Sequence, residues 1–210
     1  MIKILFFAVF IKPIVFIVLG LNLQGYQLLP LKGPAVVAAN HNSHLDVLVL
    51  MSLYPLKYLK YIRPVAAADY FFQNKIWSWI ARHCIDIIPI QRTGQSVATV
   101  LDACHQALES GQILILFPEG SRGQPEQMGQ IKKGLFYLQQ QHPQVPITPV
   151  FMRGLGKVLP RGEALFVPFN CDVIIGEPLR LHADSNEFVT QMRSIFDELS
   201  KHCVGQAWWS

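Results

Sequence analysis

The sequence predicts an α/β fold with a mainly parallel sheet flanked by helices, preceded by an apolar segment at the N-terminus. Short runs rich in β-branched residues recur along the 210 residues, and helical patterns separate several of them, which is typical of a sheet covered on both faces. Hydrophobic residues make up 51% of the chain and charged residues only 15%, against about 25% charged in an ordinary soluble domain. We therefore expect part of the surface to contact lipid.

The N-terminal segment, MIKILFFAVFIKPIVFIVLGL, is apolar apart from Lys3, Lys12 and Pro13. About twenty helical residues would span about 30 Å, the thickness of a hydrocarbon core. Lys12 would cost about 2.5–3.5 kcal/mol in the middle of a span, and Pro13 removes a backbone donor. Because the two lysines would point to opposite faces of one straight helix, we expect two short segments, hinged at Lys12-Pro13, in one leaflet; a single span is the alternative.

This segment sets the predicted division of the chain. No small-x-small cleavage site follows it, so a removable signal peptide is not expected. We assign residues 1–24 to a membrane-associated helical segment and residues 25–210 to a single α/β domain, which is an ordinary length for one domain.

Six apolar runs are predicted to form strands: PAVVAA (34–39), YIRPVAA (61–67), IDIIPI (85–90), QILILFP (112–118), VPITPVFM (145–152) and CDVIIG (171–176). Because these runs are apolar almost throughout, they indicate buried parallel strands. Such sheets carry their functional loops at the carboxyl ends of the strands. NHNSHLD, QRTG and EGSRG each follow a predicted strand, and we expect these three loops to converge.

Helical patterns occur at residues 46–54, 71–81, 96–111 and 186–203. Ser96 is a suitable N-cap for the third pattern and Gly111 a suitable stop. The last pattern places its apolar residues on one face. The second carries aromatic rings that suit either a lipid headgroup boundary or the core, namely Phe71, Phe72, Trp77 and Trp79.

Charge and cysteine content narrow the function classes. The formal net charge of +4 and the pI of about 8.9 fit an anionic membrane surface or phosphorylated substrates. No stripe of Lys and Arg interleaved with aromatic residues occurs, so nucleic acid is not expected as a partner. The four cysteines contain no C-x-x-C pair, and we expect reduced thiols.

The stretch NHNSHLD, residues 40–46, contains side chains used in several chemistries. A metal site would draw on His41, His44 and Asp46, but Val47 stands where a clustered site would need a further ligand. The other five histidines are scattered along the chain, so no metal is expected.

A serine nucleophile is the second alternative. The nearest approach to G-x-S-x-G is GQSVA at residues 94–98, which lacks the second glycine of the strained elbow. Ser96 is better explained as a helix cap.

The third alternative is an acid–base pair formed by His41 and Asp46. If His41 ends the loop and Asp46 lies in the first turn of the helix, the carboxylate can reach back to the imidazole. Asp46 would then orient the ring and leave the other nitrogen basic, which activates a hydroxyl supplied by a substrate. For the pair taken alone, a structural loop histidine beside an ordinary N-terminal helix acid remains open.

Four segments in order resemble the glycerolipid acyltransferase family, which includes bacterial 1-acylglycerol-3-phosphate acyltransferases. They are NHNSHLD, the arginine after IIPIQ, FPEGSR and VPITPV, within residues 33–150. The resemblance implies transfer of a fatty acyl chain from acyl-CoA or acyl carrier protein to the hydroxyl of a lysophospholipid. It implies no metal and no bound cofactor.

The resemblance also assigns roles to residues of this chain. His41 and Asp46 would be catalytic, and Arg92 would be the arginine of the second block. The third block would bind substrate through Glu119, Gly120, Ser121 and Arg122. In that loop Gly120 allows the backbone to approach a ligand closely, and the guanidinium of Arg122 can donate two hydrogen bonds to a phosphate. Glu119 would hold a neighbouring group in position.

Other residues near these blocks receive weaker roles. Pro149, in the fourth block, is expected to line the acyl route or to pack the sheet. Lys132 and Lys133 are expected on an exposed helix face, with an extended anion-binding surface as the alternative. This chain departs from the family pattern at Cys84, where glycine is frequent, and at Ser121, where threonine is frequent.

A cytosolic thioester donor implies that the catalytic face is cytosolic. We therefore expect monotopic attachment to a bacterial-type inner membrane. Three alternatives stay open: a different lysolipid acceptor such as a lyso-aminolipid, a thioester or lipid hydrolase using the same pair, and a non-enzymatic lipid-binding protein. Within NHNSHLD, we expect Asn40, Asn42 and Ser43 to shape the turn by local hydrogen bonds and His44 to take no part.

Overall fold

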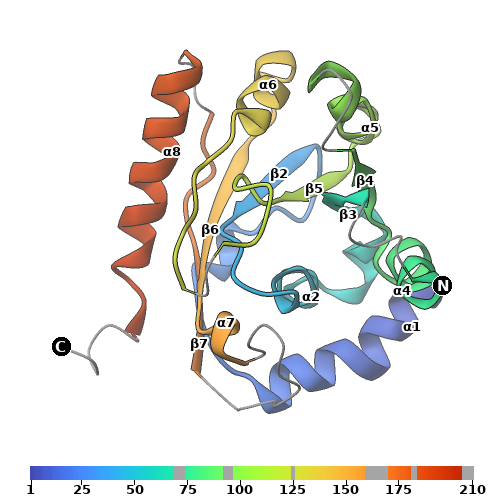
Figure 1. Ribbon diagram of the computed structural model, residues 1–210. Helices are drawn as coiled ribbons and strands as arrows, with labels where there is room; N and C mark the ends of the chain where they lie inside the picture. The colour runs from blue at the N-terminus through green and yellow to red at the C-terminus, as the bar shows by residue number, and fades with distance from the viewer. Residues whose placement is uncertain (69–73, 92–96, 124–125, 159–169, 181–183, 205–210) are drawn as a thin grey trace.

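The computed structural model describes the chain except for residues 69–73, 92–96, 124–125, 159–169, 181–183 and 205–210 (Figure 1). The described residues form a seven-stranded sheet in the order β1-β7-β6-β2-β5-β3-β4. The strands are β1 Gly20–Gln24, β2 Ala35–Ala39, β3 Ile62–Ala67, β4 Ile88–Ile90, β5 Ile113–Leu116, β6 Ile147–Arg153 and β7 Asn170–Ile175.

All neighbouring strands are parallel except β6 and β7, which pair antiparallel. The predicted fold class, a mainly parallel sheet flanked by helices, is confirmed. The central strands β2 and β5 are buried along their whole length, because helices cover both faces and every side chain meets an apolar layer.

Helices form a layer on each face of the sheet (Figure 1). One layer contains α5 Val97–Glu109, α6 Gly134–Gln141 and α8 Ser185–Ser200, whose buried residues share one apolar cluster. The other contains α1 Ile2–Phe6, η1 Phe7–Ile11, η2 Ile14–Val18, α2 Leu45–Leu53, η4 Leu56–Tyr61, η5 Ala81–Ile85 and α7 Leu155–Val158. The remaining elements are η3 Tyr26–Leu28 and α4 Lys75–Ile80.

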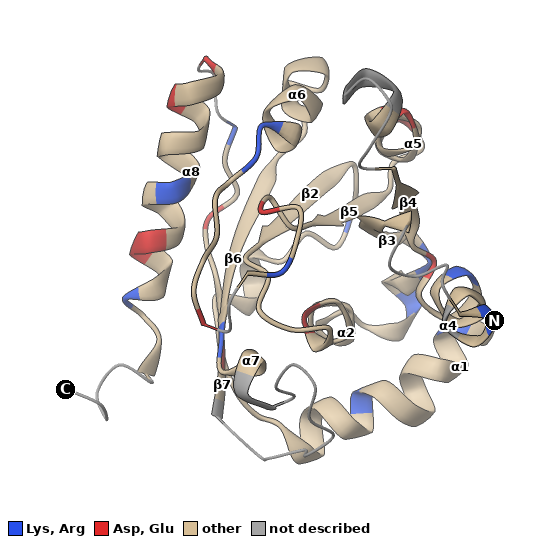
Figure 2. Ribbon diagram, viewed as in Figure 1, with Lys and Arg blue, Asp and Glu red and all other residues tan. Residues whose placement is uncertain are grey.

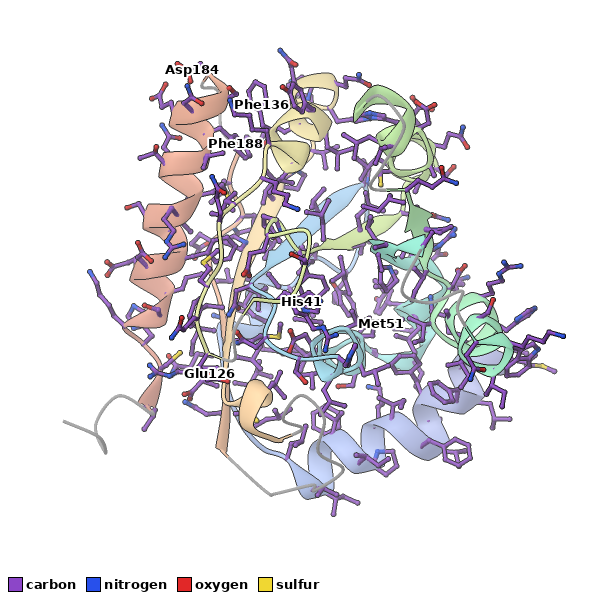
Figure 3. All side chains as sticks on the ribbon, viewed as in Figure 1. His41, Met51, Glu126, Phe136, Asp184 and Phe188 are labelled. Atoms are coloured by element: carbon purple, nitrogen blue, oxygen red, sulfur yellow. The ribbon has the colours of Figure 1, made fainter. Side chains whose placement is uncertain are left out.

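Side chains fill the space between the layers (Figure 3). Phe136 of α6 and Phe188 of α8 meet edge to face with their ring centroids 5.7 Å apart. On the opposite face α2 is apolar nearly all round and is enclosed between the sheet and the N-terminal helix, as expected of a fully buried helix.

All six predicted strands are present, although the prediction placed the start of β4 too early. Ile85 ends η5, and Asp86 adopts a left-handed φ of 66° before the strand begins at Ile88. The predicted stop of α5 is also confirmed, since Gly111 has φ of 71° and its N–H donates to Leu108. The cysteines are buried and form no disulfide within the described residues, as expected for reduced thiols.

Residues 2–18 continue as one helix through Lys12-Pro13, so the expectation of two hinged segments is wrong. Lys12 and Pro13 both have helical φ and ψ, and the Lys12 N–H donates to Phe7, five residues back. The π-type turns on both sides of Pro13 accommodate the missing N–H without a break. No helix among the described residues is both long enough and apolar enough to cross a bilayer.

One face of this helix is buried in the protein. The buried positions recur at every fourth residue, namely Lys3, Phe7, Ile11, Val15 and Leu19. The other face stays apolar and exposed, with Ile17 82% exposed. Figure 2 shows one basic segment in the middle of this helix, and by sequence its two basic residues are Lys3, near its start, and Lys12, near its middle.

Lys3 belongs to the packing side of the helix rather than to its outer surface. Its ammonium donates to the carbonyl of Ile62 at 2.7 Å and lies 3.8 Å from a carboxylate oxygen of Asp86. Burial lowers the pKa of Lys3 to about 8, against the opposing attraction of Asp86. The two lysines that suggested opposite faces therefore lie in different surroundings, one inside the protein and one outside.

The N-terminal helix also ends earlier than the predicted boundary at residue 24. Gly20–Gln24 forms β1, which pairs in parallel with β7 and belongs to the sheet. The helix and the α/β domain therefore share one core.

Candidate active site

The stretch NHNSHLD leaves the carboxyl end of β2 and enters α2. Asn40 pairs reciprocally with Met152 of β6: its amide donates to the Met152 carbonyl at 2.9 Å, and the Met152 N–H donates to its oxygen at 2.6 Å. The Asn42 amide also donates to the Met152 carbonyl, at 2.7 Å. The expectation of local bonds is therefore wrong for the side chains of both asparagines, which connect the loop after β2 to β6, although the Asn42 N–H does donate locally to Asp46. Ser43 does bond locally, accepting from the Leu45 N–H.

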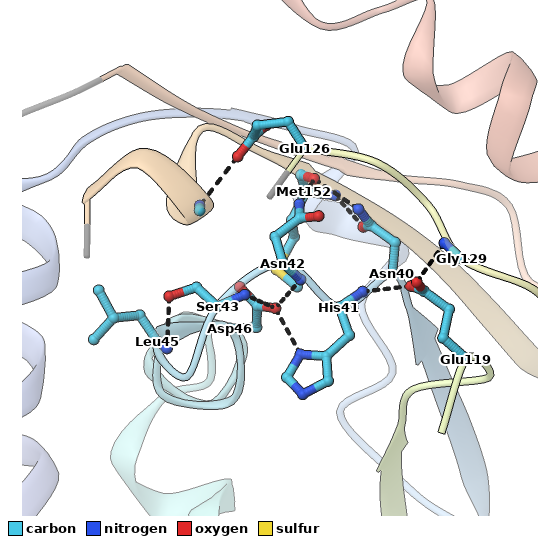
Figure 4. A network of polar contacts seen from close by, with 11 residues as sticks. Asn40, His41, Asn42, Ser43, Leu45, Asp46, Glu119, Glu126, Gly129 and Met152 are labelled. Carbon is cyan, nitrogen blue, oxygen red and sulfur yellow. Dashed lines mark hydrogen bonds and ion pairs between the residues drawn. The ribbon is translucent and has the colours of Figure 1, made fainter. Parts of the chain in front are cut away.

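His41 and Asp46 form the predicted pair (Figure 4). Nδ1 of His41 lies 2.8 Å from Oδ2 of Asp46, and the backbone N–H groups of Asn42 and Ser43 donate to the same oxygen at 2.7 and 2.8 Å. Burial raises the pKa of Asp46, while the hydrogen bonds from His41, Ser43 and Asn42 act in the opposite direction. With Nδ1 directed at the carboxylate, Nε2 is the nitrogen left for a reacting group.

The His41 ring is held from its face by Phe117. The two rings stack with centroids 4.1 Å apart and planes 22° from parallel. The His41 side chain remains 18% exposed. The FPEGSR motif therefore contributes a residue that orients His41, a role that was not predicted for Phe117.

Glu119 connects the same motif to the backbone of His41. Its Oε1 accepts the His41 N–H at 2.7 Å and its Oε2 accepts the Gly129 N–H at 2.6 Å (Figure 4). Burial raises the pKa of this carboxyl, and the hydrogen bonds from Gly129 and His41 oppose that rise. This geometry supports the positioning role expected for Glu119, because both oxygens are occupied by backbone groups.

The rest of the motif forms a tight turn beside the pair. Gly120 has φ of 68°, and its N–H donates to Phe117 at 2.9 Å. Ser121 is exposed and Arg122 is half-buried. The pKa of His44 is lowered to about 4. Burial is the main cause, the positive charge of Arg122 is the second, and His41 is the third. His44 is therefore neutral at pH 7, and the positive charge here belongs to Arg122.

The sequence profile of the Acyltransferase family matches residues 20–153. The chain belongs to this family. The resemblance carried by the four motifs is thereby confirmed, and the match includes both the His41–Asp46 pair and the FPEGSR turn.

This acyltransferase is similar to several curated proteins. It is 32% identical to the chloroplastic 1-acyl-sn-glycerol-3-phosphate acyltransferase LPAT1 of Arabidopsis thaliana, over 76% of this chain and 43% of that protein. It is 28% identical to the human 1-acyl-sn-glycerol-3-phosphate acyltransferase alpha, over 75% of this chain and 54% of that protein. The chain spans about half the length of these relatives.

A solved structure shares the fold. The crystal structure of the 1-acyl-sn-glycerophosphate (LPA) acyltransferase PlsC from Thermotoga maritima matches with a TM-score of 0.73, over 96% of this chain and 80% of that chain. The sequences are 18% identical over this match, so the likeness shows a common fold.

Pro149 does not join the pair, and a second predicted site residue cannot be placed beside it. Arg92 lies outside the described residues. Pro149 packs beside Gly176 and Leu199, since a Cβ built on Gly176 would lie 3.0 Å from Pro149 Cγ and 3.1 Å from Leu199 Cδ2. Because side chains alternate along β6, Pro149 faces the α8 layer and not the layer of His41. This is a sheet-packing position.

The donor set of the site does not resemble a metal centre. Within the described part of the chain, no three His, Cys, Asp or Glu side chains are grouped to hold an ion. Nδ1 of His41 is directed at Asp46, and the oxygens of Glu119 are directed at backbone N–H groups.

Proposed function

We propose that this acyltransferase moves a fatty acyl chain from a thioester donor to the free hydroxyl of 1-acylglycerol-3-phosphate, giving phosphatidic acid. The observation that carries the proposal is the hydrogen-bonded His41–Asp46 pair, with Nε2 left for a substrate, beside the turn that bears Arg122. The relatives named as 1-acyl-sn-glycerol-3-phosphate acyltransferases support this choice of acceptor.

The pair supplies acid–base catalysis without an enzyme nucleophile. Nε2 of His41 takes the proton of the acceptor hydroxyl as its oxygen attacks the thioester carbonyl. Asp46 holds the proton on Nδ1 and stabilises the imidazolium that forms. When the tetrahedral intermediate collapses, the carbon–sulfur bond breaks and His41 returns the proton to the thiolate. The donor, acyl-CoA or acyl carrier protein, is a substrate, and no bound cofactor takes part.

The acceptor is oriented by its phosphate. Arg122 offers a planar fork of donors that suits phosphate oxygens, and Arg92 is proposed as a second cation. Ser121 leaves room for the headgroup because it is exposed and its side chain is small. Holding the phosphate fixes the distance between the acceptor hydroxyl and His41.

We also propose that the exposed face of the N-terminal helix lies in the interfacial region of a membrane, with the catalytic face in the cytosol. Large apolar side chains are exposed along this helix and on α4, where Ile76 and Trp79 reach the surface. Lys12 lies 5.6 Å from the centre of the Phe16 ring, a position from which its ammonium can reach the headgroups. A bacterial-type inner membrane is the proposed location.

Acyl transfer is tested with purified protein, labelled acyl-CoA or acyl carrier protein, and each of three acceptors: 1-acylglycerol-3-phosphate, a zwitterionic lysophospholipid and a lyso-aminolipid. The expected product is labelled phosphatidic acid, and its formation should be abolished by His41→Ala. Free fatty acid that forms at the same rate without acceptor would instead identify a hydrolase. Release of neither product by the wild-type protein would contradict an enzymatic role.

A further inference from the structure

Lys132 and Lys133 lie just before α6, in a segment whose backbone is attached to the FPEGSR turn at two points. The Lys132 N–H donates to the Pro118 carbonyl at 2.9 Å, and the Gly129 N–H donates to Glu119 at 2.6 Å. The backbone of Lys132 is therefore held against the FPEGSR turn.

The side chain of Lys132 runs across Gly120. A Cβ built on Gly120 would lie 3.1 Å from Cδ and 3.2 Å from Nζ of Lys132. Because Gly120 has no side chain and a φ of 68°, the turn leaves this space to the lysine. The ammonium of Lys132 therefore lies over Gly120, and Gly120 is two residues before Arg122 on the same turn.

The charge of Lys132 is not neutralised within the described part of the chain, where its ammonium has no ion pair or side-chain hydrogen bond. The neighbouring carboxylate of Glu119 already accepts two backbone N–H groups. Lys133 differs, because its ammonium donates to the Ser185 hydroxyl at 3.0 Å and so contacts α8. One lysine is directed to the turn and the other to the helix layer.

We propose that Lys132 binds the phosphate of the acceptor together with Arg122; this inference rests on the proposed function. A phosphate monoester carries a charge of about −1.5 to −2 at pH 7, so Arg122 alone leaves it incompletely balanced on this turn, whether or not Arg92 also contributes. Lys132 adds a second positive charge on the same turn. It thereby favours acceptors with a phosphate monoester over uncharged acceptors, while Arg122 supplies the directional hydrogen bonds.

The test compares Lys132→Met with the matched control Lys133→Met, since methionine keeps much of the side-chain volume and removes the charge. Binding of 1-acylglycerol-3-phosphate and of monoacylglycerol is measured in detergent micelles without donor. Transfer kinetics are measured with the same acceptors. Lys132→Met should raise the Kd and the KM of the phosphate-bearing acceptor about tenfold. Its kcat and its use of monoacylglycerol should stay within about twofold of wild type.

Lys133→Met should leave the preference for the phosphate-bearing acceptor unchanged, and Lys132→Arg should retain it. The role of Lys132 would be overturned if both methionine variants lost the preference for the phosphate-bearing acceptor equally. It would also be overturned if Lys132→Met kept that preference. Wild-type binding that does not distinguish the two acceptors would also overturn it. Phosphate-dependent binding without any transfer would instead overturn the proposed function, and the binding constants would still decide the role of Lys132.

Discussion

Asp46 receives three hydrogen bonds on one carboxylate oxygen, from the His41 ring and from two backbone N–H groups. Its other oxygen, Oδ1, is buried and accepts no hydrogen bond from the described residues. One oxygen of this carboxylate therefore both shapes the loop and orients the His41 imidazole.

Asp46→Asn should separate these two contributions. The amide oxygen can accept the same three hydrogen bonds, and the amide nitrogen can occupy the position of Oδ1. We expect a folded protein whose kcat is lower by about 10²–10⁴-fold, because the imidazolium loses its counter-charge. Steady-state rates and a thermal melt measure the two effects. A large fall in Tm with an unchanged kcat would show that the charge serves only the loop.

Phe117→Leu should lower kcat about tenfold, because the His41 ring loses the stacked face that fixes its orientation. Phe136→Leu is the matched control, since Phe136 packs against Phe188 in the other helix layer. Both variants should lose about 1–2 kcal/mol of unfolding free energy. Urea unfolding and initial rates provide the comparison, and an equal kcat in the two variants would contradict the role of Phe117.

At this scale the sequence predicted the hydrogen-bonded His41–Asp46 pair but not the contacts that hold it in place. His41 and Asp46 are five residues apart, so a loop that runs into a helix brings them together with short-range geometry. Asn40 bonds to Met152, 112 residues further along the chain, and no local pattern specifies that partner. The stacking of Phe117 also depends on β2 and β5 being neighbours, which only the folded sheet establishes.

At the scale of elements, the N-terminal helix combines a core face with a lipid-compatible face. Its regular spacing of buried residues could be predicted from the sequence only if the helix ran unbroken through Pro13. The π-type turns that make this possible have no clear sequence signal. GLNLQ, which forms β1, was not predicted because it is short and contains few β-branched residues.

Ile17→Asp tests the outer face of this helix. Because Ile17 is 82% exposed, we expect an unchanged Tm. We expect about a tenfold loss of binding to vesicles of anionic phospholipid, since a charged group replaces an apolar one at the interface. Vesicle flotation measures the bound fraction. Val204→Asp, at an exposed apolar position outside this helix, is the control, and equal losses in the two variants would contradict an interfacial helix.

Lys3→Met tests the inner face. The pKa of Lys3 is about 8 in the folded protein, against an ordinary lysine value of 10.5. Between these pH values the unfolded chain binds the proton more tightly, so the free energy of unfolding should rise with pH through this window. At pH 7 the buried charge costs about 3 kcal/mol by this linkage. Denaturant unfolding at pH 7 and pH 10 should show Lys3→Met more stable at pH 7, with a smaller difference at pH 10; a pH-independent difference would contradict this account.

At the scale of the whole molecule, the site draws on three adjacent strands. The loop after β2 carries His41, the FPEGSR turn follows β5, and β6 provides Met152 as the partner of both asparagines. Strand order could not be obtained from the sequence, although the convergence of loops at the carboxyl ends of parallel strands could. The described parts of NHNSHLD and FPEGSR do converge, because β2 and β5 are paired neighbours.

The pairing of β1 with β7 has a consequence for synthesis of the chain. Gly20 is in register with Asn170, so this edge of the sheet stays open until about 150 further residues have left the ribosome. The helix before β1 leaves the ribosome before the strands do, with both its core face and its outer face uncovered. A nearby bilayer is then the earliest apolar surface available to it. If this helix binds lipid as proposed, its attachment would precede completion of the sheet, and the chain would fold at the membrane surface.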